Sequence, residues 1–133
     1  MSKINDYAKF VDTCTSNESK DYRAFMSRAS DLESQEMVSV PRVLTSAIGM
    51  LAESGEFTEI MKKVIFQGKE FGEAERFHMK RELGDILWYW IQGCIALGYT
   101  PDEVMDENIK KLEARYPNGF EVARSENRQQ GDI

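Results

Sequence analysis

Histidine, cysteine and proline are scarce in this chain of 133 residues, which has one histidine, two cysteines and three prolines. Cys14 and Cys94 cannot make a disulfide framework, and with a single histidine, His78, they are too few for a Cys/His zinc site. One histidine is also a weak basis for a Ser/His/Asp triad. No glycine-rich phosphate loop is present, because Gly68 and Gly72 lack the lysine and hydroxyl context of that motif. We expect two reduced cysteines that pack inside a cytoplasmic protein.

Positive charge is also in deficit: 17 Lys and Arg against 23 Asp and Glu give a net charge of −6. Such a chain is a poor partner for nucleic-acid polymers and anionic membranes, whose phosphates attract basic surfaces. Long apolar runs are missing as well. Residues 86–97 include Gln92 and are far shorter than the roughly 20 residues that span a bilayer. The N-terminal residues lack the apolar core of a signal peptide, so we expect no membrane association.

Strand patterns are absent too, because no segment alternates cleanly between apolar and polar residues. Helical periodicity, with proline and glycine at the breaks, predicts five helices at about 4–14, 21–33, 39–66, 73–97 and 101–115. The sequence therefore predicts an all-α bundle of about four to five helices. We divide it into a helical extension (residues 1–38), a core (39–120) and a polar, flexible tail (121–133).

Four acidic residues occupy helix positions that should be apolar. At about 100° per residue, Glu53 falls inside the broad apolar arc of the helix 39–66, and Glu56 lies one turn on at its edge. Glu59, by contrast, points to the polar side. Glu82 shares a face with apolar residues of the helix 73–97, and Asp85 follows one turn along the same stripe. These two acid pairs are the most informative feature of the sequence.

Ionised carboxylates are unfavourable in an apolar environment unless they are paired or bind a metal. If the two long helices are antiparallel, the pairs face each other, and four carboxylates around one small space repel strongly without a cation. Mg²⁺ prefers hard oxygen ligands and keeps several waters. The pattern predicts a four-carboxylate Mg²⁺ site between the two helices, with Mn²⁺ as an alternative ion and room for a phosphate ligand. The competing explanation is salt bridges to a partner chain or to nearby cations: Lys62, Lys63, Lys80 and Arg81.

Three segments carry a recognisable set of motifs. Glu53-Ser-Gly-Glu56 is followed, after 25 intervening residues, by Glu82-Leu-Gly-Asp85. Residues 108–117 read NIKKLEARYP. Together with their flanks, these segments resemble the MazG-type all-α nucleoside triphosphate pyrophosphohydrolases, whose signature is E-x-x-E, E-x-x-D and a closing N-x-x-K-L-x-x-R-Y-P. The resemblance covers about residues 43–120.

The resemblance implies a Mg²⁺-dependent enzyme that hydrolyses (d)NTPs at the α–β anhydride to a nucleoside monophosphate and pyrophosphate. Four residues would hold the metal and form the catalytic centre: Glu53, Glu56, Glu82 and Asp85. One of these carboxylates, for example Glu53, would orient the attacking water, and the sequence leaves open which one. Asn108 and Lys111 would contact the phosphates, and Tyr89 would lie near the nucleotide.

The preferred base stays open at this point. Some dCTP-preferring relatives stack a tryptophan on the base seven residues after the second Glu of E-x-x-E, where this chain has Lys63. One alternative is a dUTP or dCTP hydrolase of narrow specificity on the same scaffold. Another is a non-enzymatic helical regulatory protein whose acids bind a structural metal.

The second long helix is apolar nearly all round, because Trp88 and Trp90 point to sides different from that of Tyr89. Such a helix is either central in the monomer or covered by a second subunit. The family resemblance implies obligate oligomers, so we expect a homodimer or a dimer of dimers that completes the bundle and its site. For His78, one turn before Glu82, we expect a partly exposed ring that bonds to a neighbouring acid rather than a catalytic role.

Overall fold

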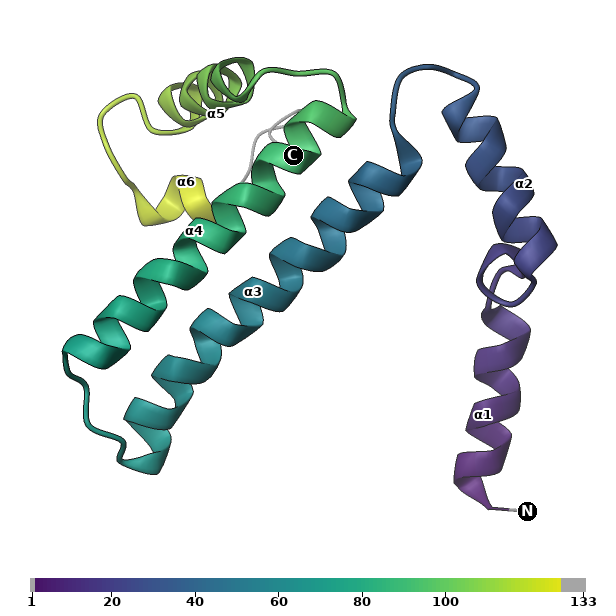
Figure 1. Cartoon of the computed structure of the whole chain (residues 1–133), viewed down its shortest axis with the longest axis horizontal. Helices are drawn as coiled ribbons and strands as arrows, with labels where there is room; N and C mark the ends of the chain where they lie inside the picture. The colour runs from purple at the N-terminus through teal and green to yellow at the C-terminus, as the bar shows by residue number, and fades with distance from the viewer. Residues whose placement is uncertain (1, 128–133) are drawn as a thin grey trace. The chain divides into compact units, whose positions relative to one another are not determined.

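The computed structural model describes residues 2–127, and the regular secondary structure of this part of the chain is helical. The helices are α1 (Lys3–Cys14), η1 (Asn17–Ser19), α2 (Tyr22–Glu33), α3 (Val40–Gln67), α4 (Glu73–Ala96), α5 (Pro101–Arg115) and α6 (Val122–Glu126) (Figure 1). The all-α prediction is therefore confirmed. None of these helices is both long and apolar enough to cross a membrane.

The chain divides into two units, Met1–Pro41 and Arg42–Ile133. In the first unit, α1 and α2 each begin at a side-chain cap. The Ser2 hydroxyl accepts the N–H of Asn5, and the Asp21 carboxylate accepts the N–H of Ala24 at 2.8 Å. No residue of α1 or α2 is buried within this chain. Cys14 is exposed, so the prediction that it packs inside the protein is wrong, whereas Cys94 is buried as expected.

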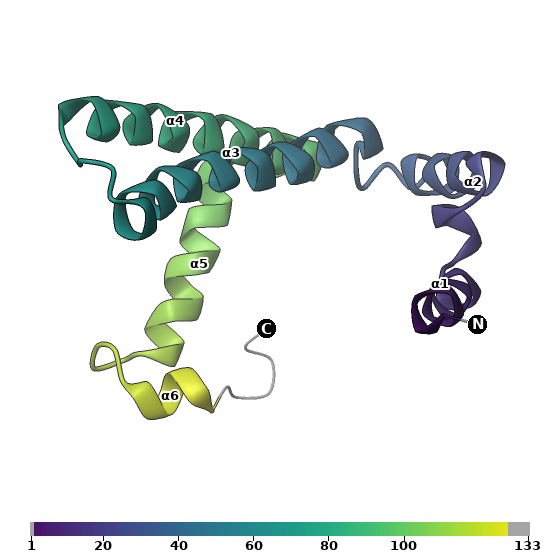
Figure 2. The same cartoon turned by 90° about the horizontal axis from the view of Figure 1, so that it is seen from below.

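In the second unit, α3 and α4 run antiparallel and side by side (Figures 1 and 2). Small residues let the two helices approach closely. The Ser46 hydroxyl donates to the backbone carbonyl of Tyr89 at 2.7 Å. A Cβ on Gly49 would lie 2.1 Å from the Tyr89 ring, and a Cβ on Gly93 would lie 2.6 Å from the Ser46 hydroxyl. This contact fixes how the two halves of the predicted metal site face each other.

The junction between α4 and α5 follows the sequence pattern closely. Gly98, at φ 75°, allows the N–H of Tyr99 to bond back to the carbonyl of Cys94 at 3.0 Å, which ends α4. Thr100 then accepts the N–H of Glu103, whose carboxylate accepts the N–H of Thr100 in return, a capping box with Pro101 in the first turn. Helix α5 packs against α4 and projects away from the α3–α4 pair (Figure 2).

The C-terminal segment contains one feature that the sequence did not predict. The short helix α6 forms inside the region expected to be a polar tail. Its first turn is held by an ion pair in which Arg124 donates to Glu121 at 3.0 Å. Residues 128–133 of the predicted tail lie outside the described part of the chain.

The buried core of one chain is small. Among the described residues, the buried hydrophobic side chains are those of Ile60, Cys94 and Ala96. Large apolar side chains on α3 and α4 are instead exposed, for example Leu51 at 76 % and Leu87 at 52 %. A single copy therefore leaves much of the apolar surface of its two longest helices uncovered.

Candidate metal centre

The two predicted acid pairs face each other across α3 and α4. Carboxylate oxygens of Glu53, Glu82 and Asp85 all lie within 4.8 Å of one another. Glu56 belongs to a second set, in which its oxygen and donor atoms of His78 and Glu82 meet the same limit. Glu82 is common to both sets. The structure therefore brings all four predicted acids into one cluster, with Glu82 at its centre.

The Glu82 side chain is only 7 % exposed. One of its oxygens, Oε1, lies 2.9 Å from Nε2 of His78, whose own side chain is 58 % exposed. The expectation of a partly exposed histidine bonded to a neighbouring acid is thus met. The other oxygen, Oε2, is buried and has no hydrogen-bond partner in the described part of the chain. Such an unsatisfied polar atom costs about 1–3 kcal/mol, and more when it is charged.

The pKa of the Glu53 carboxyl is raised above its ordinary value. The largest cause is desolvation by burial, followed by the negative charges of Glu56 and Asp85 and by the contact with Glu82. Each of these effects disfavours the ionised form. A bound cation would offset the repulsion among these carboxylates and favour the ionised form of Glu53.

Glu59 provides the contrast within the same helix. It forms ion pairs with Lys62 and Lys63, and the hydrogen bond from Lys62 is the main reason that its pKa is lowered. The salt-bridge explanation had offered these two lysines as partners of the clustered acids. Both contact Glu59 on the polar side instead, as the helical periodicity predicted for this residue. Glu59, one helical turn after Glu56, therefore belongs to an ordinary surface ion pair, and the acid cluster differs from it.

The donor set fits Mg²⁺. It consists mainly of carboxylate oxygens, which are the ligands that this hard cation prefers. Glu56 and Asp85 are exposed, whereas Glu82 is buried, so an ion held here would have protein ligands on one side and solvent on the other. That arrangement leaves positions for water and for phosphate oxygens. The Oε2 atom of Glu82, which has no hydrogen-bond partner in residues 2–127, can supply one ligand atom.

The three residues predicted to contact the nucleotide lie in two places. Tyr89 lies in the contact between α3 and α4, and Asn108 and Lys111 lie on α5. Tyr89 is half-buried, with its ring where a Gly49 Cβ would stand and edge-on to Trp88 at a centroid distance of 4.8 Å. In this chain the ring therefore fills the α3–α4 contact. Sequence reasoning overlooked Gly49, whose signal was its spacing of one helical turn from the small Ser46.

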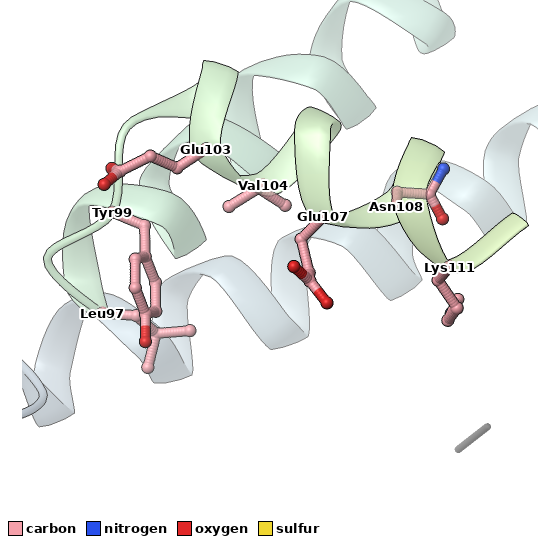
Figure 3. Close-up of a pocket in the computed structure, with 7 residues that line it drawn as sticks. All are labelled: Leu97, Tyr99, Glu103, Val104, Glu107, Asn108 and Lys111. Atoms are coloured by element: carbon pink, nitrogen blue, oxygen red, sulfur yellow. The ribbon is translucent and has the colours of Figure 1, made fainter. Parts of the chain in front are cut away.

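Asn108 and Lys111 lie one turn apart on α5 and help to line a groove of about 730 Å³ (Figure 3). The other lining residues are Leu97, Tyr99, Glu103, Val104 and Glu107. None of the four clustered carboxylates lines this groove. The structure thus brings Asn108 and Lys111 together with each other, and it does not bring them together with the acids within one copy.

Comparison with known proteins decides the family. Residues 43–120, more than half of the chain, match the MazG nucleotide pyrophosphohydrolase domain. The chain belongs to this family. Over 83 residues it is 29 % identical to the Gene 37 protein of Mycobacterium phage L5, an alignment that covers 61 % of this chain and 72 % of the phage protein. No solved structure matches the chain.

Membership confirms the resemblance drawn from the motifs, and the matched segment has the boundaries expected for it. MazG domains are nucleotide pyrophosphohydrolases, hydrolases of phosphate anhydrides. The family match contains α4, α5 and almost all of α3. All four clustered acids, together with Tyr89, Asn108 and Lys111, therefore lie in the part of the chain that defines the family.

Proposed function

We propose that this protein is a Mg²⁺-dependent nucleoside triphosphate pyrophosphohydrolase that converts a (d)NTP and water to a nucleoside monophosphate and pyrophosphate. The observation that carries the proposal is Glu82, a buried carboxylate with an unpartnered oxygen, flanked by Glu53 and Asp85 on two antiparallel helices. A buried carboxylate is favourable when it is paired or binds a cation, and a cation would also offset the charges of its acidic neighbours. Within a nucleotide pyrophosphohydrolase family, the fitting cation is the one that accompanies nucleoside triphosphates, Mg²⁺.

Each acid has a role that follows from its place in the cluster. All four acids are proposed ligands of the metal, Glu53 and Glu56 from α3 and Glu82 and Asp85 from α4. Glu53 is half-buried beside Glu82, so it can reach both the metal and the solvent side, and we assign to it the orientation of the attacking water. Bound Mg²⁺ would offset the phosphate charge and acidify a water ligand. One water is added across the α–β anhydride, which gives a nucleoside monophosphate and pyrophosphate.

Asn108 and Lys111 are the proposed phosphate contacts, with Lys111 offsetting the charge that develops on the leaving phosphates. Because their groove contains none of the clustered acids, we propose that they act on a nucleotide held by the acids of a second copy. The exposed apolar faces of α3 and α4 support an assembly of this kind. A homodimer, or a dimer of dimers, would both cover these faces and complete the site.

A panel of NTPs and dNTPs, incubated with and without Mg²⁺, tests the activity. Pyrophosphate and monophosphate are measured separately from orthophosphate. Metal-dependent release of pyrophosphate and monophosphate supports the proposal, and the preferred base separates a broad enzyme from a dUTP or dCTP hydrolase. Failure to hydrolyse any nucleotide, by a folded protein that binds Mg²⁺, would favour the regulatory alternative.

Mixing two inactive variants tests the shared site. Glu82→Gln removes a metal ligand, and Lys111→Ala removes a phosphate contact. If the acids of one copy work with the α5 groove of another, mixed dimers keep one intact site. Activity should then reappear after the two variants are unfolded and refolded together, at up to about a quarter of the wild-type value for random pairing. If the site lies within one copy, both copies of a mixed dimer are defective, and no activity returns.

A further inference from the structure

We propose that the groove beside α5 selects a guanine base, with the Tyr99 ring stacked on the base and the Glu107 carboxylate bound to its edge. The inference rests on the proposed function in one respect, that Asn108 and Lys111 contact the phosphates of a nucleotide. It goes beyond that function because it names the base, which the acid cluster and the phosphate contacts leave open. The preferred substrate would then be (d)GTP.

The size of the groove is the first argument, because it has room for a base as well as a phosphate. Its volume of about 730 Å³ lies within the range of about 300–1,000 Å³ that is usual for small-ligand sites. Along α5 its lining runs from Glu103 to Lys111, which is about 12 Å at 1.5 Å per residue. Asn108 and Lys111 occupy one end of this length (Figure 3). The rest of a bound nucleotide can therefore extend toward the other end.

The charges of the groove orient the nucleotide. Among the described residues that line it, Lys111 is the one cation, whereas Glu103 and Glu107 lie nearer to the start of α5. The phosphates are attracted to Lys111 and repelled by the two acids. The uncharged base is therefore favoured at the acidic end, where it meets apolar side chains as well as carboxylates.

Tyr99 offers the base a flat apolar surface at that end. Its side chain is 56 % exposed and lines the groove together with Leu97 and Val104. The backbone of Tyr99 is held in place, because its N–H bonds to the carbonyl of Cys94 and the next residue, Thr100, caps α5. Every base has a face that stacks on an aromatic ring. Tyr99 therefore accounts for binding of a base and leaves the choice among bases to another residue.

Glu107 is the acid that can make this choice. The other acid of the groove, Glu103, is engaged in the capping box, where its carboxylate accepts the N–H and the hydroxyl of Thr100. The Glu107 side chain is 74 % exposed, and its ion pair with Lys110 is long, at 3.8 Å. An exposed ion pair of this kind contributes little energy, so the Glu107 carboxylate can turn to a ligand.

The chemistry of a carboxylate favours guanine, because an ionised carboxylate only accepts hydrogen bonds. Guanine presents two adjacent donors, the N1–H and the 2-amino group. Adenine and cytosine place one donor beside an acceptor, and thymine and uracil place one donor between two carbonyl oxygens. A pair of parallel hydrogen bonds to one carboxylate is therefore available to guanine and to none of the other four bases.

The first test measures kcat/KM for dGTP, dATP, dCTP and dTTP with the full chain in saturating Mg²⁺. The wild type should favour dGTP by at least about fivefold, the lower end of the discrimination that a bidentate contact to a base provides. The analogue dITP, which lacks the 2-amino group, should fall below dGTP by a similar factor. Tyr99→Ala should raise KM at least about fivefold for all four nucleotides and keep their order.

Glu107→Gln should change the order of the nucleotides. Glutamine offers one acceptor and one donor, which match adenine and cytosine, so kcat/KM should fall for dGTP and rise for dATP and dCTP. Asp106→Asn is the matched control, because it removes the same charge from the preceding residue of α5, which lies outside the groove lining. It should leave the preference unchanged. A uniform rise in Glu107→Gln would show that Glu107 only repels phosphate, and a uniform fall would show a structural role; either result overturns the guanine site.

Calorimetry with dGMP, dAMP, dCMP and dTMP in Mg²⁺ tests the base site without hydrolysis. The wild type should bind dGMP most tightly, and Glu107→Gln should lose this preference. Equal affinities, or no binding of dGMP, would overturn the guanine site. Failure of the proposed function looks different, because no triphosphate is then hydrolysed whatever the affinity for dGMP. Hydrolysis of all four dNTPs with equal kcat/KM would uphold the enzyme and reject the guanine site.

Discussion

Replacing Glu82 with glutamine removes one negative charge from the centre of the cluster and keeps the side chain's size. This carboxylate is buried, its Oε2 has no donor among the described residues, and Glu53 and Asp85 offer oxygens within 4.8 Å. The glutamine amide can donate to either neighbour. Removing one unsatisfied buried group is worth about 1–3 kcal/mol. We therefore expect Glu82→Gln to stabilise the EDTA-treated protein by about this amount, which raises Tm by roughly 3–12 °C.

Mg²⁺ should reverse the order of the two proteins. An ion present at 1,000 times its Kd stabilises the folded state that binds it by about 4.1 kcal/mol, which exceeds the expected advantage of the variant. The wild type should gain this increment, and Glu82→Gln should lose most of it together with nucleotide hydrolysis. Thermal unfolding at one fixed protein concentration, in EDTA and in Mg²⁺, measures both effects. A mutation that stabilises the protein while abolishing its activity is typical of a functional site in which like charges are held close together.

Glu59→Gln is the matched control, because it makes the same change at an acid of α3 that forms ion pairs with Lys62 and Lys63. It should change the unfolding temperature slightly and leave the response to Mg²⁺ intact. The reasoning would be refuted if Glu82→Gln destabilised the EDTA-treated protein, since Glu82 would then be a satisfied structural residue. An unchanged Mg²⁺ response in Glu82→Gln would refute it equally.

Three further predictions concern stability and assembly. Gly49→Ala should destabilise the fold by about 1–3 kcal/mol in denaturant titrations, because its Cβ would meet the Tyr89 ring at 2.1 Å. Gly84→Ala should stabilise the fold by up to about 1 kcal/mol in the same assay, because its Cβ would have open space around it. Leu51→Asp, on an exposed apolar face, should shift the protein to smaller species in light scattering. The raised pKa of Glu53 contributes stability that is present at low pH and is lost as pH rises through that pKa, so the metal-free protein should unfold at a higher temperature near pH 5 than near pH 7.

The helices could be predicted from the sequence because their ends depend on local chemistry. Gly98, Thr100 and Pro101 stop one helix and start the next through hydrogen bonds within a few residues, and such signals can be read without tertiary structure. The predicted bounds of α4 and α5 accordingly agree with the structure within one residue. Helix α6 was missed since its five residues carry no apolar periodicity, and the ion pair between Glu121 and Arg124 is a weak signal.

The acid cluster could be predicted for a different reason. Helical periodicity places Glu53 and Glu82 on apolar faces, and an antiparallel pair of helices is the simplest way for the two faces to meet. The position of Asn108 and Lys111 could not be derived in this way, because it depends on the direction in which α5 leaves α4. The place of Tyr89 depends on Gly49, a contact between residues 40 positions apart that no local pattern contains.

The same two helices carry both the acid cluster and the exposed apolar faces. Without a cation, repulsion between acids on α3 and acids on α4 opposes their close approach, which Ser46 and Gly49 otherwise allow. A second copy that covers α3 and α4 must bind to the geometry that this pair adopts. A metal that favours the close arrangement should therefore also favour assembly, and linkage requires the effect to be mutual.

Sedimentation at several protein concentrations should show tighter association in Mg²⁺ than in EDTA, and the difference should vanish in Glu82→Gln. Equal association in both buffers would show that the metal centre and the interface are energetically independent.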